Sequence, residues 1–468
     1  MSDILSLAFA VAFFFISGRA LLWLLDRDGG LGAGPFVRLA MSFMLGLGGI
    51  SLQMFFYSLA HVPFGVAGIA APWAALSALP LLKKWKNPVF SGAGFLRGAG
   101  ITGIVSLAIM FSQAAYAFIY GAIPPITAWD AFQTWFFKAN VFFRDRAVVS
   151  AFFDTPFVHP DYPLLTPLSA AWVYTCLGHV NDALVRVIYP IQYASLLLVF
   201  YYLVKRISTV RAALVSSALL SMTPILMVHG AGLPVRMGEL YTGDFVGYAD
   251  LALSVYFLAA AGFFHLYCVE GQERQIVLAA VFLGLGAWTK DEGTVFAAVG
   301  SLVAVIEAMR RPGAGWKRLL LFFGALFAVA GPWTAYKIWH HIPGEYSRTM
   351  SLAAFMANIG RLPRILKFIG FIMFGKVSLN SLTWYAYAAS VMAGFKRAFK
   401  RPLIYLNVFV LAQLSAYVFI FTITHLDLEF HLRTSVDRLV LQLTPVAMLA
   451  VAVGLSGLLR TEEAGKNS

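Results

Sequence analysis

Five short segments of the sequence carry ionisable side chains at the ends of long apolar runs. They contain Asp130, the pair His159 and Asp161, Asp250, the triplet Lys290, Asp291 and Glu292, and Arg438. Near a bilayer a charged side chain costs free energy unless it is paired, solvated or used in function. A carboxylate of this kind can serve as a general base, and a lysine or arginine can bind a phosphate. We therefore treat all five segments as candidate parts of a functional site.

Each position also has a simpler interpretation. Asp130 and Asp250 could cap the helices that follow them, because Asp is a favoured N-cap residue. The triplet 290–292 could be the solvated tip of a helical hairpin, and Arg438 could extend its head group to the membrane surface. His159-Pro160-Asp161 could be a rigid surface turn.

The functional interpretations are distinct for each segment. Lys290 would bind a phosphate while a neighbouring carboxylate, Asp291 or Glu292, holds it in place. Arg438 would grip an anionic ligand through two parallel hydrogen bonds. His159 and Asp161 together could bind a divalent metal ion or a phosphate.

The composition defines the broad class of protein. Of the 468 residues, 60% are hydrophobic and 12% are charged, and the formal net charge is +13. This excludes an ordinary soluble domain, in which about 25% of residues are charged. The basic clusters lie between apolar runs, where they orient membrane helices and contact anionic lipid, so we expect no nucleic-acid partner. No nucleotide-binding glycine loop is present, so we expect no nucleotide cofactor. Cys176 and Cys268 are expected to remain free thiols.

The apolar runs predict an all-α polytopic membrane protein with about thirteen transmembrane helices. The expected helices span about 4–25, 38–60, 65–82, 99–120, 185–204, 210–229, 249–268, 276–288, 294–309, 319–339, 378–395, 403–423 and 438–459. The basic clusters at 83–86, 205–206, 310–318 and 396–401 all fall on one side of this topology, which the positive-inside rule assigns to the cytoplasm.

One integral domain accounts for most of the chain. Residues 1–98 are expected to form N-terminal helices that precede a core at 99–459, and residues 460–468 a cytoplasmic tail. The stretch 121–184 is interrupted by prolines and rich in aromatic residues, so we expect short amphipathic helices lying on the outer membrane surface.

The same topology sorts the acidic residues toward the external side. The members of this group are Asp130, Asp154, Asp161, Asp182, Glu239, Asp244, Asp250, Asp291, Glu292, Asp427, Glu429 and Asp437. Carboxylates collected at one face indicate a site on that face. A transport path would instead need charges inside the spans that reach both faces.

Taken together, the five segments resemble the GT-C superfamily of integral-membrane glycosyltransferases. That superfamily includes the aminoarabinose transferases of lipid A, the protein O-mannosyltransferases and the galacturonosyl transferases of rhizobial lipopolysaccharide core. The most similar group is glycosyltransferase family 39, also described as RgtA/B/C/D-like. The elements that carry the resemblance stand in the family order: WDAFQTWFFKA, HPDYPLLTPL, YADLAL, TKDEG and TSVDRLVLQLTP. They cover about residues 99–459, and about three helices precede the usual first helix of the family.

The resemblance implies a GT-C-like bundle and a polyprenyl-phosphate sugar as donor. It implies that Asp130 is the catalytic base, that Lys290 and Arg438 bind the donor phosphate, and that a divalent ion could be held by His159 and Asp161. Asp250, Asp291 and Glu292 would be supporting acidic residues. The expected acceptor is a glycan, glycolipid or protein of the cell envelope, at the periplasmic face of a bacterial inner membrane. The alternative hypothesis is a transporter or flippase of a lipid-linked sugar.

Overall fold

The structure is a computed structural model that describes residues 2–82, 98–121, 125–149, 159–232, 245–311, 313, 315–346 and 350–466. Three of the acidic residues expected on the external side, Asp154, Glu239 and Asp244, and the basic cluster 83–86 lie outside these residues. The described residues form helices and connecting segments, with no strand among them. The all-α prediction is confirmed for this part of the chain.

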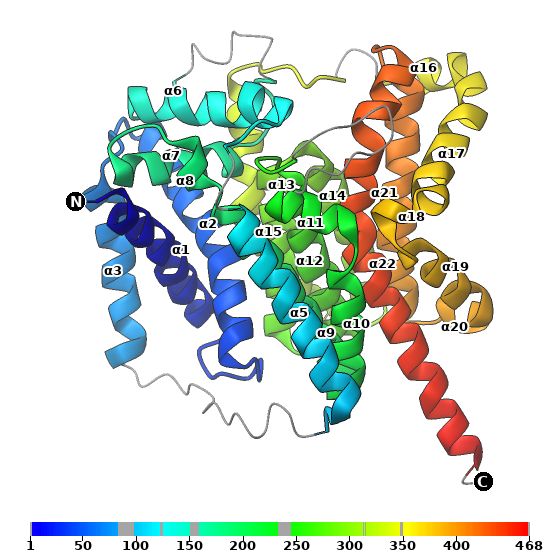
Figure 1. The fold of residues 1–468 in the computed structure, drawn as a ribbon. Helices are drawn as coiled ribbons and strands as arrows, with labels where there is room; N and C mark the ends of the chain where they lie inside the picture. The colour runs from blue at the N-terminus through cyan, green and yellow to red at the C-terminus, as the bar shows by residue number, and fades with distance from the viewer. Residues whose placement is uncertain are drawn as a thin grey trace.

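Helices follow one another through the whole of the described chain (Figure 1). Their bounds are α1 (Asp3–Leu25), α2 (Pro35–Leu59), α3 (Val66–Leu82), α5 (Gly100–Gly121), η1 (Ala131–Phe136), α6 (Phe137–Asp145), α7 (Leu165–Leu177), α8 (Asp182–Val185), α9 (Ile188–Ile207), α10 (Val210–Ser221), α11 (Pro224–Ala231), α12 (Asp250–Glu270), α13 (Glu273–Thr289), α14 (Asp291–Met309), α15 (Gly315–Trp339), α16 (Leu352–Ala357), η5 (Ile359–Arg361), α17 (Leu362–Gly370), η6 (Phe371–Gly375), α18 (Val377–Asn380), α19 (Thr383–Ala393), α20 (Phe395–Ala398), α21 (Leu403–Ile423) and α22 (Leu428–Lys466).

Nine helices in the described residues are long and apolar enough to cross a bilayer, and the bent pair α10 and α11 makes a tenth. This is fewer than the thirteen expected. Three of the expected spans are shorter helices: α3 and α13 have 17 residues each, and the run 378–395 is broken at Ser381, where φ is +49°. The difference from thirteen is one of helix length within the described residues, and α3 is largely exposed rather than covered by protein. By length and hydropathy the chain is a multi-pass integral membrane protein.

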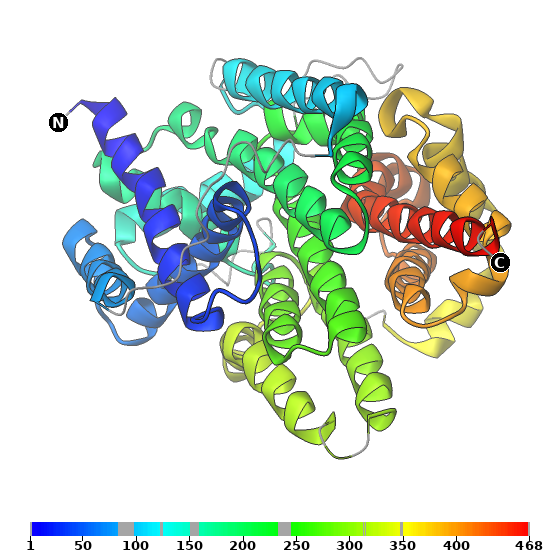
Figure 2. The ribbon, with the colours of Figure 1, turned by 90° about the horizontal axis from the view of Figure 1, so that it is seen from below.

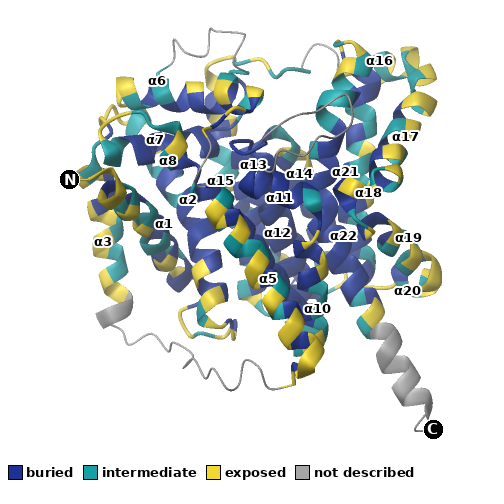
Figure 3. Ribbon diagram, viewed as in Figure 1, coloured by how far each residue is buried: buried dark blue, intermediate teal, exposed yellow. Residues whose placement is uncertain are grey.

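Helix α12 lies at the centre of the bundle. It packs against α9, α13 and α22, and nearly all of its side chains are buried (Figure 3). Seen from the end of the bundle, α1 to α3 lie on one side of this centre and α17 to α20 on the opposite side (Figure 2). The only charged residues of α12, Asp250 and Glu270, are its first and last residues.

The N-terminal helices are joined tightly to each other and to this centre. An added Cβ at Gly18 would lie 1.6 Å from the Ser42 carbonyl oxygen, so glycine is what permits α1 and α2 to approach so closely. Hydrogen bonds continue into the core: Tyr256 donates to the Met44 carbonyl at 2.9 Å, and Trp288 donates to the Ser51 hydroxyl at 2.9 Å. Interhelical hydrogen bonds of this kind hold helices together where no water competes.

The segment expected to lie outside the bundle does contain short helices. α6 lies across one end of the bundle helices (Figure 1). α7, however, is buried rather than superficial: Leu165, Leu168 and Trp172 are inaccessible, and the Trp172 indole donates to the Ala10 carbonyl at 3.1 Å. Its apolar side chains are covered by α1, α2 and α6, which leaves no face of α7 to lie on a membrane.

Basic residues converge on the end of α12 that is farther from Asp250. Arg206 pairs with Glu270 at 2.5 Å. Arg311 donates to the Cys268 carbonyl at 3.0 Å, and Arg401 pairs with Glu307. Three of the four basic clusters used to orient the helices therefore meet at one end of the molecule, as the expected topology requires.

Candidate functional site

The expected loop before the last span is helical, and this moves Arg438 into the body of a helix. α22 begins at Leu428, so the prediction that Arg438 opens its helix is wrong. The charged residues at the start of α22 form ion pairs. Arg433 contacts Glu429 at 2.5 Å across one helical turn, and Arg364 also contacts Glu429. Arg438 then projects from the third turn of α22 toward the end of the bundle that α6 covers.

Asp130 and Arg438 form an ion pair across 308 positions of sequence. The Asp130 side chain is 39% exposed and that of Arg438 is 13% exposed, so the pair lies at the boundary of the protein interior. Asp130 makes no capping hydrogen bond to the helix that follows, which removes the simple capping interpretation of this residue.

Tyr248 is the third member of this group. Its hydroxyl accepts a hydrogen bond from the Asp130 backbone N–H at 3.4 Å, and the Arg438 guanidinium lies 4.9 Å from the centre of its ring. Burial, together with the charge of Asp130, raises the pKa of Tyr248 to about 12, so the hydroxyl stays protonated and can donate.

A second charged group lies at the junction of α13 and α14. Lys290 contacts Asp250 at 3.0 Å and Glu292 at 2.8 Å, and its side chain is only 8% exposed. Burial alone would lower the pKa of Lys290, but the charges of Asp250 and Glu292 outweigh burial and raise it. The solvated-hairpin interpretation of residues 290–292 is therefore wrong for Lys290.

Asp250 is held by two side chains, one from the junction of α13 and α14 and one from α22. Besides Lys290, Gln442 of α22 donates to the same carboxylate oxygen at 2.5 Å, and the N-cap position of α12 is Ala249 rather than Asp250. Gln442 in turn accepts a hydrogen bond from Tyr417 of α21 at 2.6 Å. Asp291 points elsewhere and pairs with Lys337 of α15 at 3.4 Å.

His159 and Asp161 belong to a neighbouring polar group. Asp161 is buried and accepts a hydrogen bond from the Glu345 backbone N–H at 2.9 Å, while His159 lies 3.7 Å from the Glu345 carboxylate. The charge of Asp161 is among the influences on the pKa of Lys138, His159 and Glu345.

Lys138 lies beneath this group with no exposed surface. Its ammonium donates to the His159 carbonyl at 2.6 Å and lies 5.6 Å from the Tyr162 ring centre. Burial lowers the pKa of Lys138 to about 7, although Asp161 and Asp291 act in the opposite direction. Tyr162 is stacked between Trp135 and His159, so aromatic packing fixes the position of this segment.

The metal interpretation finds no set of ligands. Within the described part of the chain, no group of three or more His, Cys, Asp or Glu side chains is placed to hold a metal ion. The His159 Nδ1 lies 3.7 Å from the Glu345 carboxylate, and one oxygen of Asp161 accepts a hydrogen bond from a backbone N–H. A metal ion at His159 and Asp161 stays a prediction, and the mechanism proposed for this protein does not require one.

The thiols behave as expected from the sequence. Cys176 and Cys268 are both free.

Sequence reasoning missed several residues of this region. Tyr248, Lys138 and Gln442 stand inside the segments that were singled out, so their motifs offered a signal, whereas Glu345 and His229 stand outside all five. His229 of α11 is 1% exposed and stacks on Phe245 at 5.2 Å, and neither of its ring nitrogens has a hydrogen-bond partner in the described residues. A buried polar group left without a partner calls for an explanation.

The fold and the site define a multi-pass integral membrane protein with a polar cluster at one end of its helical bundle. The chain matches no known protein-family model and no curated protein. The resemblance to the GT-C superfamily therefore stays a prediction that rests on the five sequence segments.

Proposed function

We propose that the protein is a glycosyltransferase that moves a sugar from a polyprenyl-phosphate donor to a hydroxyl of an envelope glycan, glycolipid or protein. The observation that carries the proposal is the contact between Asp130 and Arg438. It places a partly exposed carboxylate beside a largely buried cation at the end of a membrane bundle. An acid–base group next to an anion-binding group is what such a transfer needs.

Asp130 is the base in this mechanism. Its carboxylate takes the proton from the acceptor hydroxyl while the hydroxyl oxygen attacks the anomeric carbon of the donor sugar. The bond from that carbon to the phosphate oxygen breaks, and polyprenyl phosphate leaves with the bonding electron pair. One displacement at the anomeric carbon inverts its configuration. The hydrogen bonds at Asp130 orient the base before the acceptor arrives.

Arg438 stabilises the negative charge that develops on the leaving phosphate. One of its terminal nitrogens holds Asp130, and its Nε is buried without a hydrogen-bond partner in the described residues. An unused donor beside the base can bind a phosphate oxygen without releasing the base.

Lys290 has a supporting role in the same proposal. Two of its contacts are taken by Asp250 and Glu292, and an ammonium has three donors, so one N–H remains for a phosphate oxygen. Asp250 also contributes to the field around Arg438, which couples the two cationic groups. Asp291 pairs with Lys337 and takes no direct part.

The cellular location follows the same reasoning. The proposed site lies at the end of the bundle opposite the basic clusters at 205–206, 310–318 and 396–401. Under the positive-inside rule those clusters are cytoplasmic, so we place the site at the periplasmic face of a bacterial inner membrane.

The test compares Asp130→Asn with Asp145→Asn in a deletion strain. Asp145 is an exposed residue at the end of α6, so its substitution makes the same chemical change nearby but outside the ion pair. Loss of a general base should slow transfer by about 10²–10⁴-fold. Mass spectrometry of the envelope glycans should therefore show one sugar missing in the deletion strain, restored by Asp145→Asn and not by Asp130→Asn.

A binding measurement on the same variant shows whether the substitution affects turnover alone, as the transferase requires, whereas a flippase needs no general base. Purified Asp130→Asn protein should still bind polyprenyl phosphate, because Arg438 and Lys290 remain. If Asp130→Asn restores the missing sugar at the normal rate, Asp130 is not a base and the proposal fails.

A further inference from the structure

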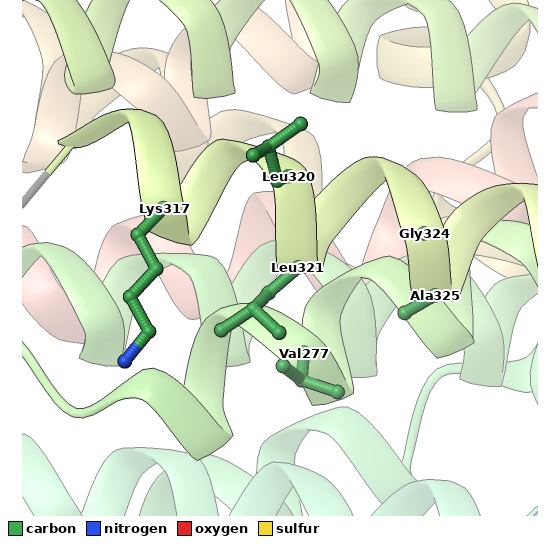
Figure 4. A pocket seen from close by; sticks show the side chains of 6 residues that line it. All are labelled: Val277, Lys317, Leu320, Leu321, Gly324 and Ala325. Atoms are coloured by element: carbon green, nitrogen blue, oxygen red, sulfur yellow. The ribbon is translucent and has the colours of Figure 1, made fainter.

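Helices α13 and α15 leave a groove of about 440 Å³ between them, and none of the residues of the proposed active site lines it (Figure 4). Its lining residues are Val277, Lys317, Leu320, Leu321, Gly324 and Ala325. α15 is a candidate span of which little is buried inside the protein, and Leu320 is 74% exposed. The groove therefore faces the hydrocarbon of the surrounding bilayer.

The lining residues of α15 follow one helical stripe. Residues 317, 320, 321, 324 and 325 recur at the spacing of a single helix face, so the groove runs along the helix for about 12 Å. Small residues make it hollow: an added Cβ at Gly324 would find no atom within 4 Å. An elongated apolar hollow of this shape fits one hydrocarbon chain.

One end of the groove is cationic. Lys317 stands in the first turn of α15 beside Arg318, and both face a single carboxylate, Glu273, at 3.6 and 4.0 Å. The Arg318 Nε has no hydrogen-bond partner in the described residues. Two cations and one carboxylate leave an excess of positive charge, which an anionic group can neutralise.

This end also lies at the level of the lipid head groups. Lys317 follows Arg310 and Arg311, which end the preceding span, and Trp316 is 67% exposed. Exposed tryptophan and basic residues at the ends of spans mark the membrane interface. The cationic end is thus where a phosphate would sit when a chain from the same lipid lies in the groove.

We propose that this groove binds an anionic phospholipid of the surrounding bilayer, with one acyl chain along α15 and its phosphate at Lys317. Basic sites between transmembrane helices on the cytoplasmic side are suited to anionic head groups. The apolar stripe supplies affinity for any diacyl lipid, and Lys317 supplies the preference for a negative head group. The inference is independent of the proposed enzymatic function.

The test uses the full chain, purified in a non-ionic detergent and titrated with dioleoylphosphatidylglycerol or dioleoylphosphatidylcholine. The two lipids have the same chains and differ in head-group charge. Native mass spectrometry gives the dissociation constant of the tightest-bound lipid. The wild type should bind phosphatidylglycerol about five-fold more tightly than phosphatidylcholine, as expected for one basic residue near a lipid phosphate.

Two pairs of variants examine the two ends of the groove. Lys317→Ala should weaken phosphatidylglycerol binding about five-fold and leave phosphatidylcholine unchanged, while Lys396→Ala removes an exposed lysine of another basic cluster and should change neither. Gly324→Leu fills the hollow and should weaken both lipids roughly ten-fold. Gly331→Leu makes the same change on α15 outside the groove and should weaken neither.

Each comparison can overturn the proposal. Equal binding of the two lipids by the wild type would remove the role of charge. Equal effects of Lys317→Ala and Lys396→Ala would assign the preference to the basic surface as a whole. Normal binding by Gly324→Leu would show that no chain occupies the groove. Gly324→Leu is expected to fold, because the added side chain enters open space and leucine favours a helix more than glycine does.

Discussion

The ion pair between Lys290 and Asp250 should behave asymmetrically when its two partners are removed separately. Asp250 is 1% exposed and Lys290 is 6% exposed. Lys290→Met leaves the Asp250 carboxylate buried with only the Gln442 amide against it. Breaking a buried pair in this way costs about 3–5 kcal/mol of unfolding free energy, because an uncompensated charge stays in the interior.

The opposite substitution should cost less. In Asp250→Asn the ammonium of Lys290 keeps its contact with Glu292 at 2.8 Å, and the new amide can still accept hydrogen bonds. The expected loss is about 1–2 kcal/mol, the usual range for a weakened buried hydrogen bond. The double variant has no buried unpaired charge at position 250, so its loss should fall about 2 kcal/mol or more below the sum of the two single losses.

Unfolding in mixed detergent micelles at neutral pH, followed by circular dichroism, measures these differences. Lys337→Met is the matched control: its pair with Asp291 spans 3.4 Å between partly exposed side chains, and its loss should stay below about 1 kcal/mol. If the double variant loses as much unfolding free energy as the two single variants together, Lys290 and Asp250 do not interact. The arrangement of α12, α13 and α14 described above would then be incorrect.

Three further predictions concern single residues. Arg438→Lys keeps the positive charge but loses the planar guanidinium with its parallel N–H donors, so the rate of sugar transfer should fall about 10–100-fold with unchanged protein yield. A normal rate of product formation would show that a point charge is enough. Burial, and then the charge of Asp161, raises the pKa of Glu345 to about 7, so Glu345 contributes stability that is present below about pH 4.5 and lost as the pH rises through 7. Melting curves from pH 4.5 to 8 should therefore decline less in Glu345→Gln than in the wild type, and parallel curves would contradict this. His229→Phe removes two unpartnered ring nitrogens and keeps the stacking on Phe245, so the free energy of unfolding should stay level or rise by about 1 kcal/mol; a clear loss would reveal a missed hydrogen bond.

Much of the fold was predictable because the bilayer imposes strong rules on sequence. Backbone groups must be paired within helices in hydrocarbon, so long apolar runs predict spans. Ten of the thirteen expected spans coincide with helices or a bent pair that meet the length and hydropathy of a span. The other three coincide with shorter helices: α3 and α13 have 17 residues each, and α18 and α19 are separated at Ser381.

The sequence by itself determined the class of protein and the positions at which charge interrupts apolar runs, because the free-energy cost of charge in a membrane acts on each residue separately. Only the tertiary structure decided which charges meet. Asp130 reaches Arg438 because α22 begins ten residues before it and crosses the end of the bundle, and Lys290 faces Asp250 because α13 packs on α12. Such pairings depend on helix packing between distant parts of the chain, and the spacing of residues along the sequence carries no record of it.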